Sequence, residues 1–479
     1  MVCQNCITHG VCDALRTFAP SLSSAQTFNG ARCRQVARTQ QGPPKTVTNF
    51  IFIVSDDLGY ADLGCYGGRG ECSPVLDRLA AHGVRYTDGY SNSPVCSPTR
   101  FALATGRYQY WIRGASEEPM SGNAKGNPEL GLFPEVPTVA SMLKEKGYHT
   151  ALIGKWHLGF RPHFGPEKSG YMHHFGPMSG GVSYYGHNAR SPGCDLELDG
   201  QPYDEPGYLT DLISRRAEQY VRDRAADQQP FLLSLHYTAP HWPWETRAQG
   251  KADPEISANI SHLDGGSVQT YQTMIREMDE GIGWVVDALR ETGLLEDTLI
   301  IFTSDNGGER FSDNWPLVGG KMDLTEGGIR VPYIVHWPAG VAAPGRISAQ
   351  HCMSMDWTAT ILDIAGVTPA AGHALDGVSM LPTLVQADTS FERPMFWRMK
   401  YNDQRAYRLG KWKYLKVNEY EYLFDLEADA RERANQAKRQ PERLAHMRQV
   451  YEAWNAGLPA IPPEANCNVI YSLADMPAR

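Results

Sequence analysis

Short apolar segments that are separated by helical patterns constrain the fold of this chain most strongly. An apolar run without alternating polar residues suits a strand that is buried on both faces, as in a parallel sheet. Four such segments are Phe50–Val54, Thr150–Ile153, Phe231–Leu235 and Leu299–Phe302. Helical patterns lie between them, over residues 75–82, 138–146, 208–223 and 275–289. This alternation predicts an α/β fold with a large mixed, mostly parallel sheet flanked by helices.

The pattern changes after Pro382, where aromatic segments become short and closely spaced, as is typical of antiparallel strands. The segments are 396–397, 406–409, 412–415 and 422–424, and a helix with one apolar face is expected over 441–454. We therefore expect a smaller C-terminal antiparallel α+β subdomain. The predicted division of the chain is a disordered leader over 1–45, a main domain over 46–385, the subdomain over 386–457 and a loose tail over 458–479.

Composition narrows the range of partners. The 479 residues include 45 Lys and Arg against 54 Asp and Glu, and a net charge of −9 without a basic stripe argues against nucleic acid. No apolar run approaches the roughly 18 residues of a membrane span, so no membrane partner is expected. Residues 1–45 lack the features of a secretory signal, and we expect a cytoplasmic location.

Cysteines give two further expectations. Cys3, Cys6 and Cys12 in the leader resemble part of a metal site, but no second ligand pair follows at zinc-finger spacing. The cysteines after the leader are scattered through a large chain and are expected to be free thiols rather than a disulfide framework.

Two strand ends carry similar polar side chains. Asp56 and Asp57 follow the first apolar segment, and Asp305 and Asn306 follow the fourth. Ligands in α/β sheets bind at this carboxyl edge. Three carboxylates and an amide are hard oxygen ligands that suit Ca²⁺, with Mg²⁺ as the alternative, and suit zinc poorly. Either pair alone is also typical of an ordinary turn, whereas the two pairs together favour a metal site.

The dodecamer from Cys96 to Arg107, which reads CSPTRFALATGR, is the second candidate site. A single cysteine is usually a small buried hydrophobe. However, Pro98 indicates a helix start, so Cys96 would lie near a helix N-terminus, where backbone N–H groups favour anions. Arg100 adds a positive charge nearby. A thiolate nucleophile is conceivable here, although a hard-cation site prefers oxygen donors.

Further cations and imidazoles follow other predicted strands. Lys155 and His157 come after the second strand, two residues apart, so an extended backbone would turn both to one side. His236 and His241 follow the third strand, and His241, between prolines, is the better candidate for chemistry. Lys321 lies in a glycine-rich loop that can approach an anion. Glu326 and Arg330, four residues apart, are expected to form a structural pair.

Taken together, these motifs resemble the sulfatase family of the arylsulfatase type, within the alkaline phosphatase superfamily, from about Asn49 to Gly457. The resemblance implies an alkaline phosphatase-like fold, with residues 46–385 as the catalytic domain and a four-stranded C-terminal subdomain. It also implies that a maturation enzyme oxidises Cys96 to formylglycine (3-oxoalanine), whose hydrate attacks the sulfate ester. Thr99 stands where serine is commoner in the family, and its hydroxyl should still serve for recognition by that enzyme.

The resemblance assigns roles to the candidate residues. The metal ligands would be Asp56, Asp57, Asp305, Asn306 and the modified Cys96. Arg100 and Lys155 would hold the formylglycine, Lys155 would also contact the substrate, and His157 would assist regeneration. His241 and Lys321 would bind sulfate and protonate the leaving oxygen, and Ser179 would touch the sulfate. Three carboxylates, a divalent ion and three cations make this pocket positive despite the acidic chain.

The expected function is hydrolysis of a small-molecule or carbohydrate sulfate ester to an alcohol and inorganic sulfate. Two alternatives stay open: a phosphodiesterase or phosphonate monoester hydrolase of the same superfamily, and an inactive protein that binds sulfate esters. Aromatic side chains near the expected pocket mouth would stack on a sugar or aryl group, or serve only for packing; they are Tyr184, Tyr185, Trp242 and Trp244. The sequence does not indicate an oligomeric state.

Overall fold

A ten-stranded mixed sheet forms the centre of the protein in the computed structural model, which describes residues 47–189 and 193–468. The predicted leader, with its cysteines, lies outside the described residues. The strands, in sheet order, are β11 (Arg346–Ser348), β2 (Val84–Tyr86), β10 (Tyr333–His336), β9 (Thr298–Ser304), β1 (Asn49–Ser55), β8 (Phe231–His236), β4 (His149–Gly154), β5 (His173–Pro177), β6 (Leu196–Leu198) and β7 (Gln201–Pro202).

The five central strands, from β9 through β1, β8 and β4 to β5, are all parallel, and antiparallel strands lie outside them on both sides. Every residue of β1, β8 and β9 is buried, because helices cover both faces of the sheet. This burial explains why these strands are continuous apolar runs. The predicted mixed, mostly parallel α/β sheet is confirmed.

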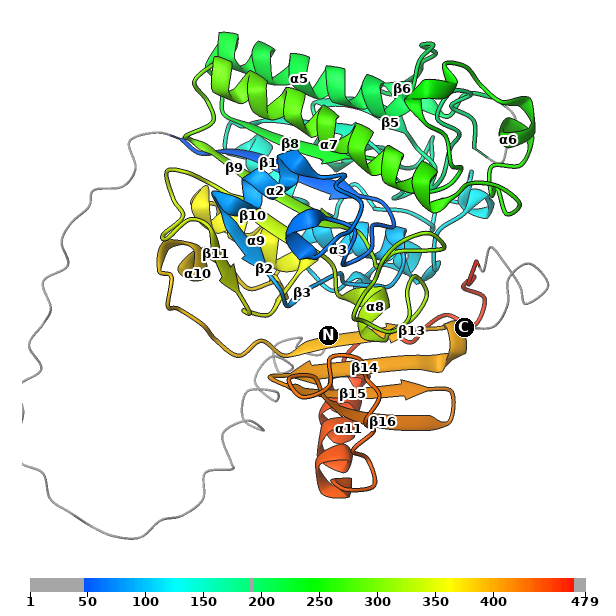
Figure 1. Cartoon of the computed structure of the whole chain (residues 1–479), viewed down its shortest axis with the longest axis vertical. Coiled ribbons are helices and arrows are strands. Elements are labelled where there is room, and N and C mark those ends of the chain that lie inside the picture. The colour runs from blue at the N-terminus through cyan, green and yellow to red at the C-terminus, as the bar shows by residue number, and fades with distance from the viewer. Residues whose placement is uncertain (1–46, 190–192, 469–479) are drawn as a thin grey trace, which may run out of the picture.

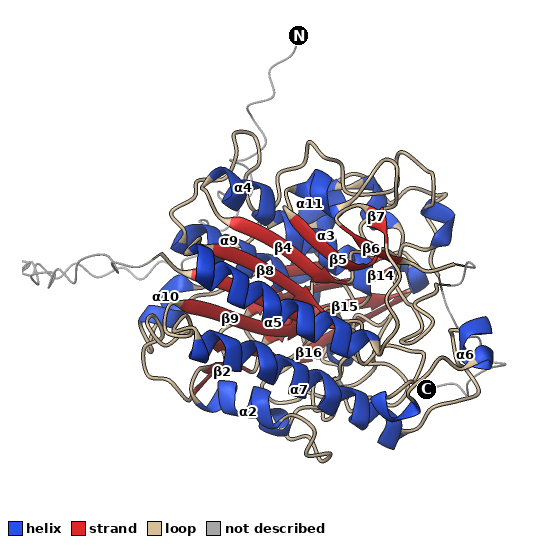
Figure 2. Ribbon diagram, turned by 90° about the horizontal axis from the view of Figure 1, so that it is seen from above, coloured by secondary structure: helices blue, strands red, loops and turns tan. Residues whose placement is uncertain are grey.

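Successive side chains of β1 enter different cores. Ile51 and Ile53 pack under α2 (Pro74–Ala81), α5 (Leu209–Asp227) and α7 (Val268–Glu291). Phe50, Phe52 and Val54 pack against α3 (Cys96–Thr105), α4 (Val139–Glu145) and α9 (Ser354–Ile364). Figure 2 shows α5 and α7 running side by side across one face of the strands. The predicted helices are present, and α5 extends four residues beyond the predicted end at residue 223.

Smaller elements complete the main domain. The helices α6 (Pro254–Ala258), α8 (Glu326–Ile329) and α10 (Leu381–Val385) are short, and β3 (Gly89–Tyr90) pairs with β12 (Cys352–Met353). The 3₁₀ turns are Gly64–Tyr66, Gln109–Trp111, Arg113–Ser116, Gly122–Ala124, Pro166–Ser169, Arg247–Gln249 and Tyr401–Asp403.

The cysteines between residues 47 and 468 are unpaired. In this same part of the chain, none of the helices has the length and apolar character that crossing a bilayer requires.

The C-terminal subdomain is a four-stranded antiparallel sheet with one helix, as predicted (Figure 1). Its elements are β13 (Met395–Met399), β14 (Gln404–Leu409), β15 (Trp412–Val417), β16 (Tyr420–Asp425) and α11 (Pro441–Ala456). Aromatic side chains join helix and sheet: the Trp454 ring stacks on Phe396, with 4.7 Å between centroids. The aromatic spacing that predicted strands therefore also supplies the packing between layers.

The segment after α11 is not the loose tail that the sequence predicts, as far as it is described. Asn468 donates its backbone N–H to the Glu118 carbonyl at 3.0 Å, and the Glu118 N–H donates to Asn466 at 2.9 Å. The Asn468 side chain donates to the Pro119 carbonyl at 2.6 Å. Residues 466–468 therefore run along residues 118–119 as a short strand-like contact, which local sequence patterns do not indicate.

Candidate active site

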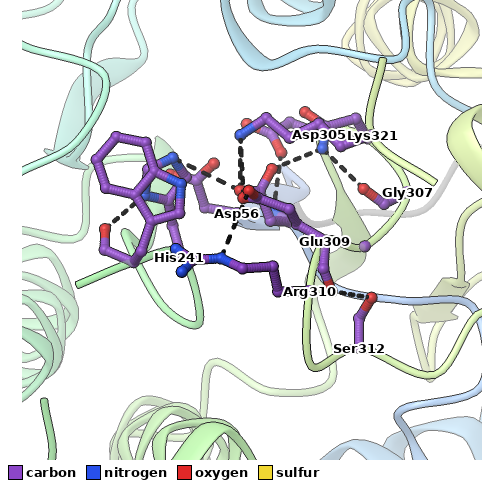
Figure 3. Close-up of polar contacts among 12 residues, drawn as sticks. Asp56, His241, Asp305, Gly307, Glu309, Arg310, Ser312 and Lys321 are labelled. Carbon is purple, nitrogen blue, oxygen red and sulfur yellow. Dashed lines mark hydrogen bonds and ion pairs between the residues drawn. The ribbon is translucent and has the colours of Figure 1, made fainter. Parts of the chain in front are cut away.

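The two predicted oxygen-ligand pairs meet at the carboxyl edge of the sheet. Strands β1 and β9 are parallel neighbours in register up to their last residues. Asp56 and Asp57 therefore lie beside Asp305 and Asn306, all of them at most 1% exposed. Ligand oxygens of the three aspartates lie within 4.8 Å of one another. Figure 3 shows Asp56 and Asp305 turned toward one point.

Two buried oxygens in this group have no hydrogen-bond partner: Asp56 Oδ1 and Asn306 Oδ1. The Asn306 amide nitrogen donates to Asp57 Oδ1 at 2.7 Å, which turns its oxygen the other way. Burying such an oxygen without a partner is costly. A hard divalent cation with oxygen ligands would satisfy both atoms, so the side chains present fit Ca²⁺ or Mg²⁺.

Each of the three aspartates also pairs with a buried cation. The pairs are Arg100 with Asp305 at 2.8 Å, Lys155 with Asp56 at 2.6 Å, and Lys321 with Asp57 at 2.7 Å. None of these six side chains is more than 4% exposed. Charges buried this deeply persist only when they are paired, so each cation is held at a defined place.

Burial and neighbouring charges shift the pKa values of Asp56 and Lys321 away from their usual values. Burial, followed by the neighbouring Asp305 carboxylate, raises the pKa of Asp56 well above its usual range. Burial alone would lower the pKa of Lys321, but the carboxylate of Asp57, among others, raises it well above the usual value. Burial and the neighbouring carboxylates thus disfavour the ionised form of Asp56, whereas the Lys321 ammonium stays protonated.

Lys155 reaches the site because β4 ends in a glycine. Gly154 has a φ of 116°, and a Cβ atom there would lie 1.8 Å from the His236 carbonyl oxygen. The next backbone N–H, that of Lys155, donates to the same carbonyl at 2.8 Å. A left-handed glycine thus lets the chain leave β4 next to β8 and turn the lysine toward Asp56.

Cys96 is the first residue of α3, as the position of Pro98 predicts, and is 1% exposed. Burial raises the pKa of its thiol to about 11, so an unmodified side chain would be protonated at neutral pH. Thr99 accepts a hydrogen bond from the Ser93 N–H and donates to the Ser93 carbonyl, at 2.9 and 3.0 Å. The segment from Cys96 to Thr99 is thus buried in the folded chain, and the Thr99 hydroxyl joins it to Ser93.

A pocket of about 100 Å³ opens above Cys96, and the predicted His157, Ser179, His241 and Lys321 line it. His157 Nε2 shares a hydrogen bond with the Met120 carbonyl at 2.7 Å, and its Nδ1 has no hydrogen-bond partner. The structure thus brings together all the residues that the sequence assigns to the site. Their individual roles stay predictions.

His241 and Ser179 each make polar contacts with neighbouring residues that fix their orientation in the pocket. The Nδ1 atom of His241 lies 2.6 Å from the Trp242 carbonyl, and its Nε2 lies 3.5 Å from Asp57. Burial and then the charge of Lys321 lower the pKa of His241 well below its usual value. Ser179 donates its hydroxyl to Asp195 at 2.8 Å, which leaves its oxygen as an acceptor. His236, in contrast, is buried within β8 and does not line this pocket.

Sequence reasoning missed a further carboxylate, Glu309. It is 3% exposed and lies 3.9 Å from Lys321, and burial raises its pKa to about 6. Arg310 also lies 3.9 Å from Glu309, so the pair leaves the net charge of the site unaltered. A second acidic residue four positions after Asp305, past a Gly-Gly turn, was the available signal.

The structure separates the two alternatives for the aromatic side chains. Trp242 lines the pocket. Tyr184 is fully buried, with its hydroxyl donating to the carbonyls of Thr238 and His241, and Trp244 is 3% exposed and packs against Tyr271. The Tyr185, Tyr184 and Trp244 rings belong to packing between loops and helices, because none of them borders the pocket.

Comparison with known proteins agrees with this geometry. The family model of the sulfatases matches residues 48–367, and that of the N-sulphoglucosamine sulphohydrolase C-terminal region matches residues 320–453. Human N-acetylgalactosamine-6-sulfatase is 33% identical over 73% of this chain and 68% of its own length. The N-acetylgalactosamine-6-O-sulfatase of Bacteroides thetaiotaomicron is 28% identical over 88% of this chain and 96% of its own length.

Among solved structures, Ps i-CgsB in complex with k-i-k-neocarrahexaose is similar, with a TM-score of 0.78 and 31% identity. The similarity covers 86% of this chain and 94% of that chain. These matches confirm the predicted fold class and reaction class. The chain belongs to the sulfatase family, and its reaction is the hydrolysis of sulfuric esters.

Proposed function

We propose that the protein hydrolyses a carbohydrate sulfate ester with a formylglycine made from Cys96 and a Ca²⁺ ion held by Asp56, Asp57, Asp305 and Asn306. The observation that carries the proposal is the pair of unpartnered oxygens, Asp56 Oδ1 and Asn306 Oδ1, beside a cysteine at the floor of a pocket. When present, the formylglycine hydrate supplies an oxygen nucleophile for sulfur and Ca²⁺ supplies Lewis acidity toward a sulfate oxygen.

The chain's own residues would bind, orient and transfer protons. Lys321 and His241 face the pocket and would hold the sulfate oxygens, and one of them would protonate the leaving alcohol oxygen. Ser179 would donate its hydroxyl to a sulfate oxygen, in place of its hydrogen bond to Asp195. Asp305, which Arg100 orients through two bonds to one carboxylate oxygen, would accept the proton of the attacking hydroxyl.

Residue 96 itself would be held by neighbouring groups. The Lys155 ammonium donates to Asp56 at 2.6 Å, and Arg100 lies about one turn after Cys96 in α3. The free Nδ1 of His157 would take up the proton that is released when the aldehyde is restored. Overall, one water molecule is consumed, the ester S–O bond is broken, and an alcohol and sulfate leave.

A carbohydrate is the substrate class that the pocket and the relatives favour. The indole of Trp242 lies beside His241, with 4.1 Å between ring centroids, and offers an apolar surface at the pocket wall. An aromatic face next to polar groups suits the apolar face of a sugar ring. The named relatives include N-acetylgalactosamine-6-sulfatases, and one similar structure holds a neocarrahexaose.

The test is a comparison of protein made with and without a formylglycine-generating maturation enzyme. Mass spectrometry of the peptide that contains Cys96 should show an aldehyde in place of the thiol only in the first preparation. Only that preparation should turn over 4-nitrophenyl sulfate and N-acetylgalactosamine 6-sulfate, and both faster than 4-nitrophenyl phosphate. Full activity with an unmodified Cys96 would contradict the mechanism.

Two other outcomes correspond to the alternatives. Faster turnover of aryl phosphate diesters or phosphonate monoesters would indicate a phosphoesterase of the same superfamily. Binding of sulfate esters without turnover by fully modified protein would indicate a binding protein.

Cytoplasmic location also stays a prediction, which fractionation of cells that produce the tagged chain would test.

A further inference from the structure

The loop that carries Lys321 lies between the main sheet and the C-terminal subdomain. In Figure 1, α8, at the end of this loop, lies next to β13. On the side of the main domain the loop makes two backbone bonds. Lys321 donates its N–H to Gly308 at 3.1 Å, and Met322 donates to Pro94 at 3.0 Å. Met322 has a φ of 77°, a left-handed conformation that is costly for a residue with a side chain.

Gln404, the first residue of β14, holds the other side of this loop. Its Oε1 accepts a hydrogen bond from the Leu324 N–H at 2.8 Å, and its Nε2 donates to the Met322 carbonyl at 2.8 Å. The side chain is 3% exposed, so water does not compete for these groups. One amide thus fixes the backbone within one to three residues of Lys321.

A buried ion group holds the end of the same loop. Lys413 of β15 lies 2.9 Å from Glu326 and 2.9 Å from Glu432. Glu432 also accepts a hydrogen bond from the Glu326 N–H at 2.7 Å. The three side chains are at most 1% exposed. Both ends of the segment from Met322 to Glu326 are therefore attached to the C-terminal subdomain.

We propose that the C-terminal subdomain places the Lys321 ammonium in the sulfate pocket, with Gln404, Lys413 and Glu432 as positioning residues. The inference rests on the proposed role of Lys321 in binding sulfate and protonating the leaving oxygen. A lysine has a long flexible stem, so its ammonium can be held at one point only if the backbone beneath it is fixed. The strained Met322 conformation needs the same support from outside the loop.

The experiment uses full-length protein made with the maturation enzyme, and 4-nitrophenyl sulfate as the probe. Gln404→Met keeps the length of the side chain but removes the hydrogen bonds to Leu324 and Met322, together with the one that Nε2 donates to the Tyr401 carbonyl at 3.1 Å. We expect kcat/KM to fall by about 10- to 100-fold, because a misplacement of about 1 Å in a catalytic group has effects of this size. Gln404→Glu, which keeps the acceptor for Leu324 and loses the bond to Met322, should lower kcat/KM in the same direction.

The matched control is Tyr110→Phe. The Tyr110 hydroxyl joins the main domain to β13 by accepting from the Arg398 N–H at 2.8 Å and donating to its carbonyl at 3.1 Å. These are also buried contacts with the subdomain, but neither of them is made to the segment from Met322 to Glu326. A comparable loss of melting temperature with kcat/KM within about twofold of wild type is expected. An equal loss of kcat/KM in both variants would overturn the proposal, because attachment of the subdomain would then be the cause.

A double-mutant cycle provides the decisive measurement. If Gln404 acts through Lys321, Gln404→Met should have no further effect on kcat/KM in a Lys321→Ala background. Additive losses would show that Gln404 acts elsewhere and would overturn the inference. The formylglycine content of each variant, measured by mass spectrometry, must be equal, and the cycle remains valid when the variants differ in stability.

The cycle also separates the inference from the proposed function. If Lys321→Ala leaves kcat/KM unchanged, the proposed role of Lys321 fails, and the positioning inference fails with it. If Lys321→Ala lowers kcat/KM strongly while Gln404→Met and Gln404→Glu do not, the proposed function stands and only the positioning role is wrong.

Discussion

Two buried clusters of charged side chains in this protein have equal numbers of carboxylates and cations but different surroundings. The site cluster consists of Asp56, Asp57, Asp305, Arg100, Lys155 and Lys321. The interface cluster, between the main domain and the C-terminal subdomain, consists of Asp88, Glu326, Glu432, Arg330, Arg408 and Lys413. Each has three carboxylates and three cations, and charge counting alone does not distinguish them.

The difference lies in the oxygens. In the interface cluster every carboxylate oxygen has a nitrogen or hydroxyl within 3.0 Å. In the site cluster Asp56 Oδ1 has none, and the adjacent Asn306 Oδ1 has none either. In the interface cluster the one carboxylate oxygen without a hydrogen bond, Glu432 Oε1, still lies 2.9 Å from the Lys413 ammonium. The unpartnered oxygens of the site lie next to a pocket, which indicates a place for an ion.

The carboxyl pKa values show the same contrast. Burial alone would raise the pKa of Asp88, but Arg330 and Arg408 lower it below its usual value. At Asp56, burial and the neighbouring carboxylates outweigh Lys155, and the pKa is raised well above its usual value. The two arginines thus stabilise the charge of Asp88, whereas Lys155 does not fully compensate that of Asp56. The contrast concerns these two residues, because burial also raises the pKa of Glu432 in the interface cluster. The following predictions test this contrast, from the largest expected effect to the smallest.

Asp305→Asn should have the largest effect, a loss in kcat of about 10³-fold or more, because it removes the charge of a proposed metal ligand and the proposed proton acceptor. Asparagine still accepts from Arg100, whereas Asp305→Ala would leave this buried guanidinium unpaired and would destabilise the fold. Ca²⁺ should raise the melting temperature of the unsubstituted protein and not that of the variant. Unchanged kcat and an unchanged Ca²⁺ response would remove Asp305 from the site.

Asp88→Asn tests the interface cluster. Among the described residues, Asp88 is the only carboxylate within 3.0 Å of Arg330 and the only one within 3.0 Å of Arg408. Loss of its charge should lower the free energy of unfolding by about 4 kcal/mol. Because its oxygens are not in the pocket, kcat should stay within a few fold. Denaturant unfolding and turnover of 4-nitrophenyl sulfate check the two expectations. A loss of turnover as large as that of Asp305→Asn would erase the contrast between the clusters.

Glu118 offers a buried carboxyl that belongs to neither cluster. It accepts the Lys400 N–H at 2.8 Å and lies 3.7 Å from the Cys467 thiol, while Arg398 and Lys400 contribute distant positive charge. Burial nevertheless raises its pKa to about 7. The folded state therefore binds this proton more tightly than the unfolded state does.

The consequence is a pH-dependent stability. The contribution of protonated Glu118 is fully present below about pH 4.5 and is lost as pH rises through about 7, by about 3 kcal/mol in total. Glu118→Gln, which keeps the neutral form at every pH, should remove this decline from urea unfolding curves measured between pH 5 and 8. An identical slope in both proteins would show that Glu118 is ionised throughout.

Arg69→Ala should have the smallest effect. Arg69 pairs with Asp313 at 2.8 Å, but the two side chains are 83% and 30% exposed. Water screens such a pair, so the free energy of unfolding should change by less than about 0.5 kcal/mol. A loss of unfolding free energy comparable to that of Asp88→Asn would mean that burial does not control how much these ion pairs stabilise the fold.

Most of the site could be predicted because its residues follow strands directly. The apolar run before Asp56 and the one before Asp305 predict parallel strands, and the ends of parallel neighbours meet at one edge. Glu309 was missed because an acidic residue after the Gly307-Gly308 turn does not by itself show that the chain folds back toward Lys321. Gln404 was missed because the predicted strand began two residues later, at residue 406.

Long-range contacts were beyond sequence reasoning for a physical reason. The bond from Leu324 to Gln404 spans 80 residues, and that from Asn466 to Glu117 spans 349. A polar side chain in a loop has many partners open to it, and only the packed chain selects one. Tyr184 and Trp244 show the same limit of sequence-based prediction. The sequence shows that they are aromatic, but only the structure shows that they are buried.

The sequence by itself determined the alternating α/β fold, the antiparallel subdomain and the set of residues that form the site, because apolar periodicity and residues at strand ends are local properties. Only the tertiary structure decided which buried charges are satisfied, where the described part of the tail runs and which subdomain residues hold the Lys321 loop. These depend on distances between segments far apart in the chain, and a hydrogen bond or ion pair exists only when folding brings its two partners within about 3 Å of each other.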